Sequence, residues 1–462
     1  MLIVTQFMGN TSNILVETLQ YNVSTENGNT TLRYFKRRKQ LLQAIPNDSL
    51  VIIPNNSFYI RSNDVEYKFK VDNDFYYLTG FEEPNAICLL VKDKNAFSYL
   101  LFIDERKKEK EIWTGKRVSK EQIKKNYKPD QIFYLSEFFD MLKKLIQGKD
   151  HIYYPLGKNK DFDQKIINLR EELRSRNRIG IKSPKSISCP REIIHRMRLI
   201  KDEFEISLIQ KAISISQKAH IEALKKTRPG LYEYELEALI EYEFRSHGAT
   251  GPAYPSIVGS GKNACVLHYT KNNKKIKNGE LVLIDAGSEF NNYASDITRT
   301  FPANKKFTPI QKDIYEIVLE AQAKAIEQIK PGKKFLDSYN KAVLIIVEGL
   351  KELKLLKGST EQIIRKKTYK KFFMHRLGHW LGLDVHDVGP YVDENGKSIK
   401  LKPGMIMTAE PGIYIGTDLE GVPERFKGIG IRIEDDVLVT KNGCKVLTKD
   451  LPKSIKEIES FK

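Results

Sequence analysis

Four acidic side chains stand in stretches of the chain that are otherwise apolar and have the length of β-strands. Asp285 ends the run Leu281–Asp285, and Asp296 stands between small and apolar residues. Glu410 and Glu434 each follow several apolar residues. A single such acid has an ordinary explanation, namely an exposed strand end or a salt bridge. Because a charge is costly to bury without a partner, four acids in one core predict a bound cation.

Histidines cluster in the same half of the chain. Three of the eight, His375, His379 and His386, fall within one short segment, and His268 precedes Asp285 by 17 residues. The pair His375 and His379 does not match the helical zinc-protease motif, because no glutamate follows the first histidine. We expect the other four histidines to be surface or structural residues: His151, His195, His220 and His247.

The predicted ligand set is rich in oxygen. One imidazole and several carboxylates suit manganese, cobalt or zinc, and the excess of carboxylates favours manganese. Two such ions that share bridging carboxylates can hold one hydroxide between them as a nucleophile.

The hydrophobic patterns predict two domains. Apolar runs alternate with helical patterns over 32–190, which indicates an α/β domain. Two prolines and three serines over 182–190 indicate a linker. Beyond it, two helices followed by strands occur twice, and Pro229-Gly230 and Pro331-Gly332 break the helices at matching places, which predicts a pseudo-twofold domain. The predicted helices are 203–227, a second to about 247, 308–329 and 335–353, and the predicted strands are 256–258, 281–285, 294–301, 405–415 and 429–439.

The five expected ligands resemble, in order and in context, those of the pita-bread metallopeptidases: Asp285, Asp296, His379, Glu410 and Glu434. The sequence segments around these ligands are similar to those of aminopeptidase P over 257–261, 267–270, 284–287, 296–302, 373–389 and 428–436. The segment Asp74–Pro84 resembles the first domain of that family, so the resemblance runs from about residue 32 to the end of the chain.

The resemblance implies a creatinase-like α/β N-terminal domain and an α+β pita-bread catalytic domain with pseudo-twofold symmetry. We place a mobile N-terminal extension at 1–31, the first domain at 32–185, a linker at 186–200, the catalytic domain at 201–450 and a C-terminal tail at 451–462. The implied activity is that of an Xaa-Pro aminopeptidase, a dinuclear hydrolase that releases the first residue of peptides with proline in second place.

The resemblance also implies roles for individual residues. Asp296 and Glu434 would bridge two divalent ions, with Asp285 completing one site and His379 and Glu410 the other. A hydroxide bridging the ions would attack the carbonyl before proline, and Glu410 would carry its proton to the leaving nitrogen. Further residues would line or support the pocket: His268 and His386 facing the substrate, His375 and Arg432 behind the ligands, and Tyr254 with the apolar part of 373–383 around the proline ring.

Other functions stay open at this stage. A prolidase would use the same five ligands on dipeptides alone, whereas a methionine aminopeptidase needs no long leading domain. A metal-free descendant could bind peptides, histones or nucleic acid, given the net charge of +18. We expect neither nucleic-acid nor membrane binding, because the basic residues are spread along the chain and no apolar run spans a bilayer.

The distribution of cysteines bears on the compartment. The four cysteines are far apart in the sequence and show no metal-ligand or redox spacing. We read them as free thiols, which together with the absence of a signal-like start predicts a cytoplasmic protein. The resemblance to aminopeptidase P implies in addition a homodimer or homotetramer.

Overall fold

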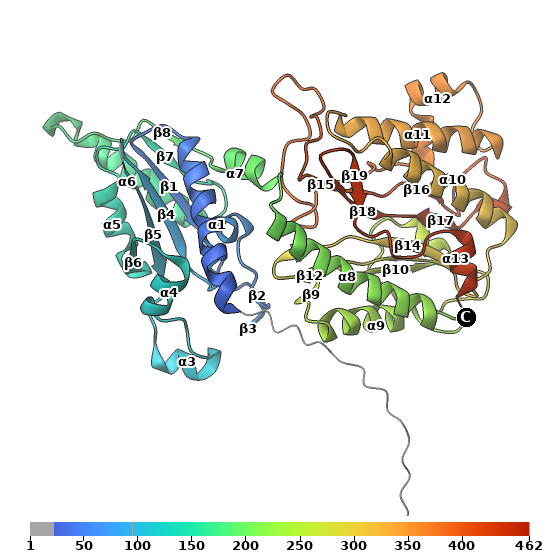
Figure 1. Cartoon of the computed structure of the whole chain (residues 1–462), viewed down its shortest axis with the longest axis horizontal. Coiled ribbons are helices and arrows are strands. Elements are labelled where there is room, and N and C mark those ends of the chain that lie inside the picture. The colour runs from blue at the N-terminus through green and yellow to red at the C-terminus, as the bar shows by residue number, and fades with distance from the viewer. Residues whose placement is uncertain (1–22, 95, 462) are drawn as a thin grey trace, which may run out of the picture. The chain divides into compact units, whose positions relative to one another are not determined.

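The computed structural model describes residues 23–94 and 96–461 (Figure 1). The chain divides into one compact unit that ends at Ser188 and another that begins at Cys189. Each unit is described separately below.

The first unit is built on a mixed six-stranded sheet, which confirms the predicted α/β class. Buried Val, Ile, Leu and Phe side chains of its central strands pack against the helices and form one core. The strand order is β6 (Gln131–Tyr134), β5 (Phe97–Ile103), β4 (Ile87–Lys92), β1 (Ser49–Pro54), β7 (His151–Tyr153) and β8 (Ser186–Ser188). Its helices are α1 (Val23–Gln43), α2 (Asn73–Thr79), α3 (Lys108–Thr114), α4 (Lys120–Tyr127), α5 (Phe138–Leu145) and α6 (Lys160–Ser175). The strands β2 (Ile60–Ser62) and β3 (Val65–Glu66) form a separate two-stranded hairpin.

Three predicted connecting segments contain regular structure. Residues 1–22 of the expected extension lie outside the described residues. The rest of that extension belongs to α1, which begins at Val23. A helix that has formed elsewhere extends readily, because each added residue gains a hydrogen bond. The expected linker at 186–200 contains β8, which completes the sheet edge, and α7 (Arg191–Arg198). The expected tail at 451–462 contains α13 (Ile455–Ser460), whose Ile458 is buried.

The second unit shows the predicted repeat of two helices followed by strands. In the first half α8 (Glu203–Lys226) and α9 (Glu233–Ser246) precede the strands, and in the second half α10 (Pro309–Ile326) and α11 (Phe335–Glu352) do so. Figure 1 shows the two helix pairs on opposite sides of the strands. The strands are β9 (Gly251–Pro252), β10 (Ile257–Ser260), β11 (Leu281–Asp285), β12 (Ser288–Phe290), β13 (Tyr293–Ala294), β14 (Thr298–Pro302), β15 (Ile406–Ala409), β16 (Gly412–Ile415), β17 (Ile429–Arg432), β18 (Asp435–Val439) and β19 (Cys444–Val446).

The long strands predicted around the acidic residues are interrupted. β11 pairs with β14, while β12 and β13 pair with each other after the chain has left that sheet. In the second half β15 pairs with β18 and β16 with β17 in one common register, so that the two paired segments are interrupted at the same level. Pro411, which has no N–H for a ladder, accounts for one break. Gly287 accounts for another, because a Cβ there would lie 1.8 Å from the carbonyl oxygen of Ser295.

A buried ionic cluster anchors the segment that contains His379 and His386. Lys201 Nζ lies 2.8 Å from Asp387 Oδ2, and Arg198 Nη2 lies 2.6 Å from Asp387 Oδ1. All three side chains are at most 3% exposed. Burial alone would raise the pKa of Asp387, but the two cations lower it below its ordinary value.

Within the described residues every helix is too short or too polar to cross a bilayer.

We predict that Asp387→Asn lowers the free energy of unfolding of the metal-free protein by about 3–5 kcal/mol at pH 7, because it removes the buried carboxylate that pairs with Lys201 and leaves Arg198 paired with the more exposed Asp384. Since the folded-state pKa of Asp387 is depressed, its contribution is present above the pKa of the unfolded chain and is lost as pH falls through the folded-state value. Urea denaturation followed by the fluorescence of the buried Trp380 measures the effect, because Trp113 is 88% exposed.

The matched control is Glu394→Gln, which removes an exposed ion pair between Arg196 of α7 and a neighbouring segment. Exposed pairs contribute little, so we expect a change within about 0.5 kcal/mol. A difference between wild type and Asp387→Asn that grew on acidification would contradict the prediction.

Candidate metal centre

A cavity of about 590 Å³ in the second unit contains the predicted site. Its lining comes from both halves of the unit, and all nine residues that the sequence singled out contribute to it: His268, Asp285, Asp296, His375, His379, His386, Glu410, Arg432 and Glu434. Residues as far apart in the sequence as His268 and Glu434 therefore meet at one place, where the four interrupted strands end.

The first half of the unit contributes two aspartates. Asp285 ends β11, and Asp296 lies between β13 and β14, where the backbone N–H of Ala286 donates to the carbonyl of Ile297 at 3.0 Å. The Tyr254 hydroxyl contacts both carboxylates, donating to Asp285 Oδ1 at 2.7 Å and to Asp296 Oδ1. The interrupted hairpin thus brings the two carboxylates to one side of the cavity, as the sequence predicted.

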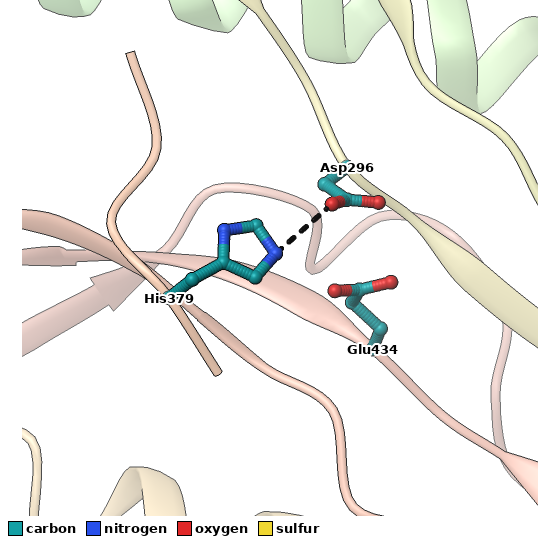
Figure 2. A group of neighbouring side chains, drawn as sticks. All are labelled: Asp296, His379 and Glu434. Atoms are coloured by element: carbon teal, nitrogen blue, oxygen red, sulfur yellow. Dashed lines mark ion pairs between the residues drawn. The ribbon is translucent and has the colours of Figure 1, made fainter. Parts of the chain in front are cut away.

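The second half contributes His379 and two glutamates. His379 Nε2 lies 3.3 Å from Asp296 Oδ2 and 3.5 Å from Glu410 Oε1. Its Nδ1 lies 3.0 Å from the carbonyl oxygen of Trp380 and donates to it, since a carbonyl can only accept. Nε2 is therefore the ring atom that faces the carboxylates. Ligand atoms of Asp296, His379 and Glu434 lie within 4.8 Å of one another, and Figure 2 shows the three side chains converging from separate segments.

Close backbone packing fixes the His379 segment against β15. The His379 N–H donates to Thr408 Oγ1 at 3.1 Å, and the Thr408 N–H donates to the His379 carbonyl at 2.9 Å. A Cβ at Gly378 would lie 2.1 Å from the Thr408 carbonyl oxygen, so only glycine permits this approach. The same threonine hydroxyl donates to Glu410 Oε1 at 3.2 Å, which ties two expected ligands together.

The site has more negative charge than its own cations balance. Burial raises the pKa of Glu410 to about 7, with Asp296 adding to the effect and His379 opposing it. The pKa values of Glu434 and Asp285 are also raised, first by burial and further by the neighbouring carboxylates. Burial lowers the pKa of His379, but the bond to Asp296 and the charge of Glu410 together raise it to about 9. The raised pKa values mean that bound protons offset part of the negative charge of the carboxylates, a charge that divalent cations could neutralise instead.

Arg432 joins the ligands to residues behind them. Its Nη2 donates to Asp285 Oδ2 at 2.5 Å, its Nη1 to the Tyr414 hydroxyl at 2.9 Å and its Nε to Thr298 Oγ1 at 3.2 Å. Thr298 Oγ1 in turn donates to Glu434 Oε2 at 2.7 Å. His375 Nε2 lies 2.9 Å from the Tyr414 hydroxyl, and burial with the charge of Arg432 lowers its pKa to about 4.

Sequence reasoning missed some of these partners. It did not single out Tyr414 or Thr298, although Thr298 follows Asp296 at the strand spacing of two that directs side chains to one face. It assigned Tyr254 to the proline ring, whereas its hydroxyl binds two aspartates. Of the apolar side chains expected from 373–383, Phe373, Leu377 and Trp380 lie in the cores instead. The apolar wall of the cavity is formed by others: Pro255, Ile257, Leu267, Val385 and Tyr391.

The remaining histidines lie outside the cavity. His220 is 2% exposed, its Nε2 lies 2.9 Å from the carbonyl oxygen of Ala286, and burial lowers its pKa to about 4, so it is a structural residue. His151, His195 and His247 are half-buried or exposed. The residues of the cavity fit a metal centre, because they supply four carboxylates and one oriented imidazole in one cavity with surplus negative charge, and three of them, Asp296, His379 and Glu434, have ligand atoms within 4.8 Å of one another.

Comparison with known proteins agrees with this geometry. Residues 207–441 match the model of metallopeptidase family M24, and residues 34–153 match the aminopeptidase P N-terminal domain. The chain is 42% identical to the Xaa-Pro aminopeptidase of Escherichia coli (strain K12) over 429 residues, covering 92% of this chain and 97% of that protein. It is 35% identical to Xaa-Pro aminopeptidase 3 of Homo sapiens, covering 94% and 86%.

Solved structures are similar over nearly the whole chain. The Pseudomonas aeruginosa aminopeptidase PepP has a TM-score of 0.90 and 46% identity, covering 93% of this chain and 97% of that one. A zinc-substituted E. coli aminopeptidase P in complex with product has a TM-score of 0.90 and 41% identity, covering 93% and 98%. These matches confirm the predicted arrangement of a creatinase-like domain followed by a pita-bread domain.

We predict that Glu434→Gln makes the metal-free protein more stable at pH 7–8 and abolishes its stabilisation by Mn²⁺. Because the pKa of Glu434 is raised on folding, the folded chain binds a proton that the unfolded chain has lost, and stability falls as pH rises. One such proton costs at most about 1.4 kcal/mol per pH unit. Glutamine removes that dependence, so a urea denaturation series from pH 5 to 8, with chelator or Mn²⁺, measures both effects.

Glu327→Gln serves as control, because Glu327 forms a surface pair with Lys324 on α10 and is 57% exposed. This variant should follow the wild type at every pH and respond to Mn²⁺ equally. Lower stability of metal-free Glu434→Gln than of wild type would refute the account of surplus charge.

Proposed function

The chain belongs to metallopeptidase family M24, and from that premise we propose that it is an Xaa-Pro aminopeptidase, which removes the first residue from peptides with proline in second place by means of two divalent cations. The observation that carries the proposal is the convergence of five ligand side chains in one cavity. The two-metal mechanism and the role of each residue are parts of the proposal.

Asp296 and Glu434 would be shared by both ions. Asp296 suits this role because it contacts His379 and also the Tyr254 hydroxyl, which in turn contacts Asp285. Asp285 would complete one site, and His379 with Glu410 the other. When bound, two divalent cations supply a Lewis acid and an ionised water at neutral pH. The carboxylate excess favours manganese over zinc or cobalt.

Glu410 would carry the proton. It lies in the cavity wall, and the Thr408 hydroxyl holds its Oε1 at 3.2 Å, while Oε2 lies 3.9 Å from His375 Nδ1. A carboxylate held in this way can take a proton from the attacking water as general base and deliver it to the leaving proline nitrogen as general acid.

His268 and His386 would bind the peptide around the scissile carbonyl. Both line the cavity, and the ring of His386 lies 4.3 Å from that of His379, centroid to centroid, in an edge-on arrangement. Ring N–H groups aimed at the carbonyl oxygen would stabilise negative charge that develops there during attack. Arg432 and His375 would act from behind, by orienting Asp285 and Tyr414.

The demand for proline follows from the bond that is cut. An Xaa–Pro bond has no N–H, and the ring fixes φ, so sites that read an N–H or an extended chain reject it. The apolar wall formed by Ile257, Leu267 and Val385 offers the ring a surface that needs no hydrogen bond. We further propose a cytoplasmic location, supported by the four free cysteines, and a homodimer or homotetramer, as the resemblance to aminopeptidase P implies.

The proposal predicts that metal-stripped protein does not cleave Xaa-Pro-Yaa peptides and that added ions restore cleavage, Mn²⁺ more than Zn²⁺ or Co²⁺. Release of the free first residue is measured for each ion. An Xaa-Ala-Yaa peptide serves as the negative control, and an Xaa-Pro dipeptide separates this activity from that of a prolidase. Absence of cleavage with every ion would overturn the proposal.

A second prediction concerns proton transfer. Glu410→Gln should lower kcat by about 10²–10⁴-fold with little change in KM, because a general base and acid is lost while substrate contacts remain. Steady-state kinetics measures both constants, and calorimetric titration with Mn²⁺ reports whether the variant still binds two ions. Glu327→Gln is again the control. A kcat close to wild type would exclude Glu410 as the proton carrier.

A further inference from the structure

One buried polar side chain lies behind the metal centre and has no role in the mechanism above. Gln322 of α10 is fully buried, with an exposed fraction of 0%. Its Nε2 donates to the carbonyl oxygens of Ala409 and Ile433, both at 3.1 Å. Its Oε1 accepts a hydrogen bond from Lys453 Nζ at 2.9 Å. The amide orientation is unambiguous, because a carbonyl can only accept and an ammonium can only donate.

The two carbonyl partners have a particular position in the chain. Ala409 directly precedes Glu410, and Ile433 directly precedes Glu434. Both lie at the level where β15 gives way to β16 and β17 to β18. A single nitrogen therefore holds the two main chains together at the residues from which both glutamates project.

The far end of the amide is fixed as well. Lys453, whose side chain is 27% exposed, forms an ion pair with the fully buried Asp435. Asp435 also receives Arg299 Nη2 at 2.8 Å, and Arg299 Nη1 donates to the carbonyl oxygen of Glu434 at 2.6 Å. Gln322 is thus part of a buried network that surrounds the backbone of Glu434 and leaves the amide little freedom to move.

We propose that Gln322 is a positioning residue that sets the separation of Glu410 and Glu434 by holding both preceding carbonyls on one amide nitrogen. The inference rests on the proposed function, since it gives the two glutamates a reason to be held at a fixed distance. Groups that orient metal ligands from behind change metal affinity by about 10–100-fold when they are replaced. Gln322→Met, which fills the space but donates nothing, should weaken Mn²⁺ binding by that factor.

The test titrates metal-stripped full-length protein with Mn²⁺ by calorimetry and records the electron paramagnetic resonance spectrum of the manganese-loaded form, in which coupling between two ions reports their spacing. Gln322→Glu is the second variant, because it retains an acceptor for Lys453 and replaces the donating nitrogen by an oxygen that faces the two carbonyls. Gln311→Met is the matched control: Gln311 lies on the same helix and donates to the carbonyl of Gly279 at 2.9 Å, away from the cavity.

We expect both Gln322 variants to bind manganese about 10–100-fold more weakly with altered coupling, and Gln311→Met to bind as wild type does even where its melting temperature falls. Wild-type affinity and coupling in Gln322→Met would overturn the inference. So would failure of both Gln322 variants to fold while Gln311→Met folds, because the amide would then serve the fold alone. If wild-type protein bound no manganese, the proposed function itself would fail, which separates the two results.

Discussion

The structure depends on holding several like charges close together inside a protein. Burial raises the pKa values of Asp285, Glu410 and Glu434, and each carboxylate raises those of its neighbours. Arg432 and the Tyr254 hydroxyl offset part of this cost but not all of it, so the folded chain retains charge that divalent cations can neutralise. The repulsion between the carboxylates lowers the stability of the metal-free protein. Metal ions that bind only the folded state relieve this repulsion and stabilise it.

Interrupted strands make this concentration of charge possible. A continuous strand would direct successive side chains to opposite faces and could bring at most alternate residues to the cavity. Each half of the catalytic unit instead breaks two neighbouring strands at one level, and an acidic ligand stands at every break. The close approach at Gly287 and the missing N–H of Pro411 are local features that fix where two of the breaks occur.

Much of the site could be predicted from sequence, because Asp285, Asp296, Glu410 and Glu434 conflict with the apolar stretches that contain them. The interruptions could not, since an apolar run on both sides of Glu434 has the pattern of one long strand. Gln322 could not be identified either: among Val318, Ala321 and Ala325 on the buried face of α10 it has no partner visible in the sequence. The role of its side chain depends on hydrogen bonds to two carbonyls that are 87 and 111 residues away in the sequence.

Different parts of this fold hold the residues proposed to bind metal and those proposed to bind the peptide. The four acidic ligands stand at the ends and breaks of core strands, and His379 is fixed against β15, whereas His268 and His386 come from loops. Each loop is tied to a buried carboxylate: Asp387 holds the second, and the fully buried Glu233 accepts bonds from Ser260, Asn263, Tyr269 and Lys274 around the first. Because the proposed metal ligands do not depend on which residue follows the scissile bond, our proposal places selection for proline in these anchored loops and the adjoining cavity wall. Substitutions there can therefore change the peptides accepted while the metal centre stays intact.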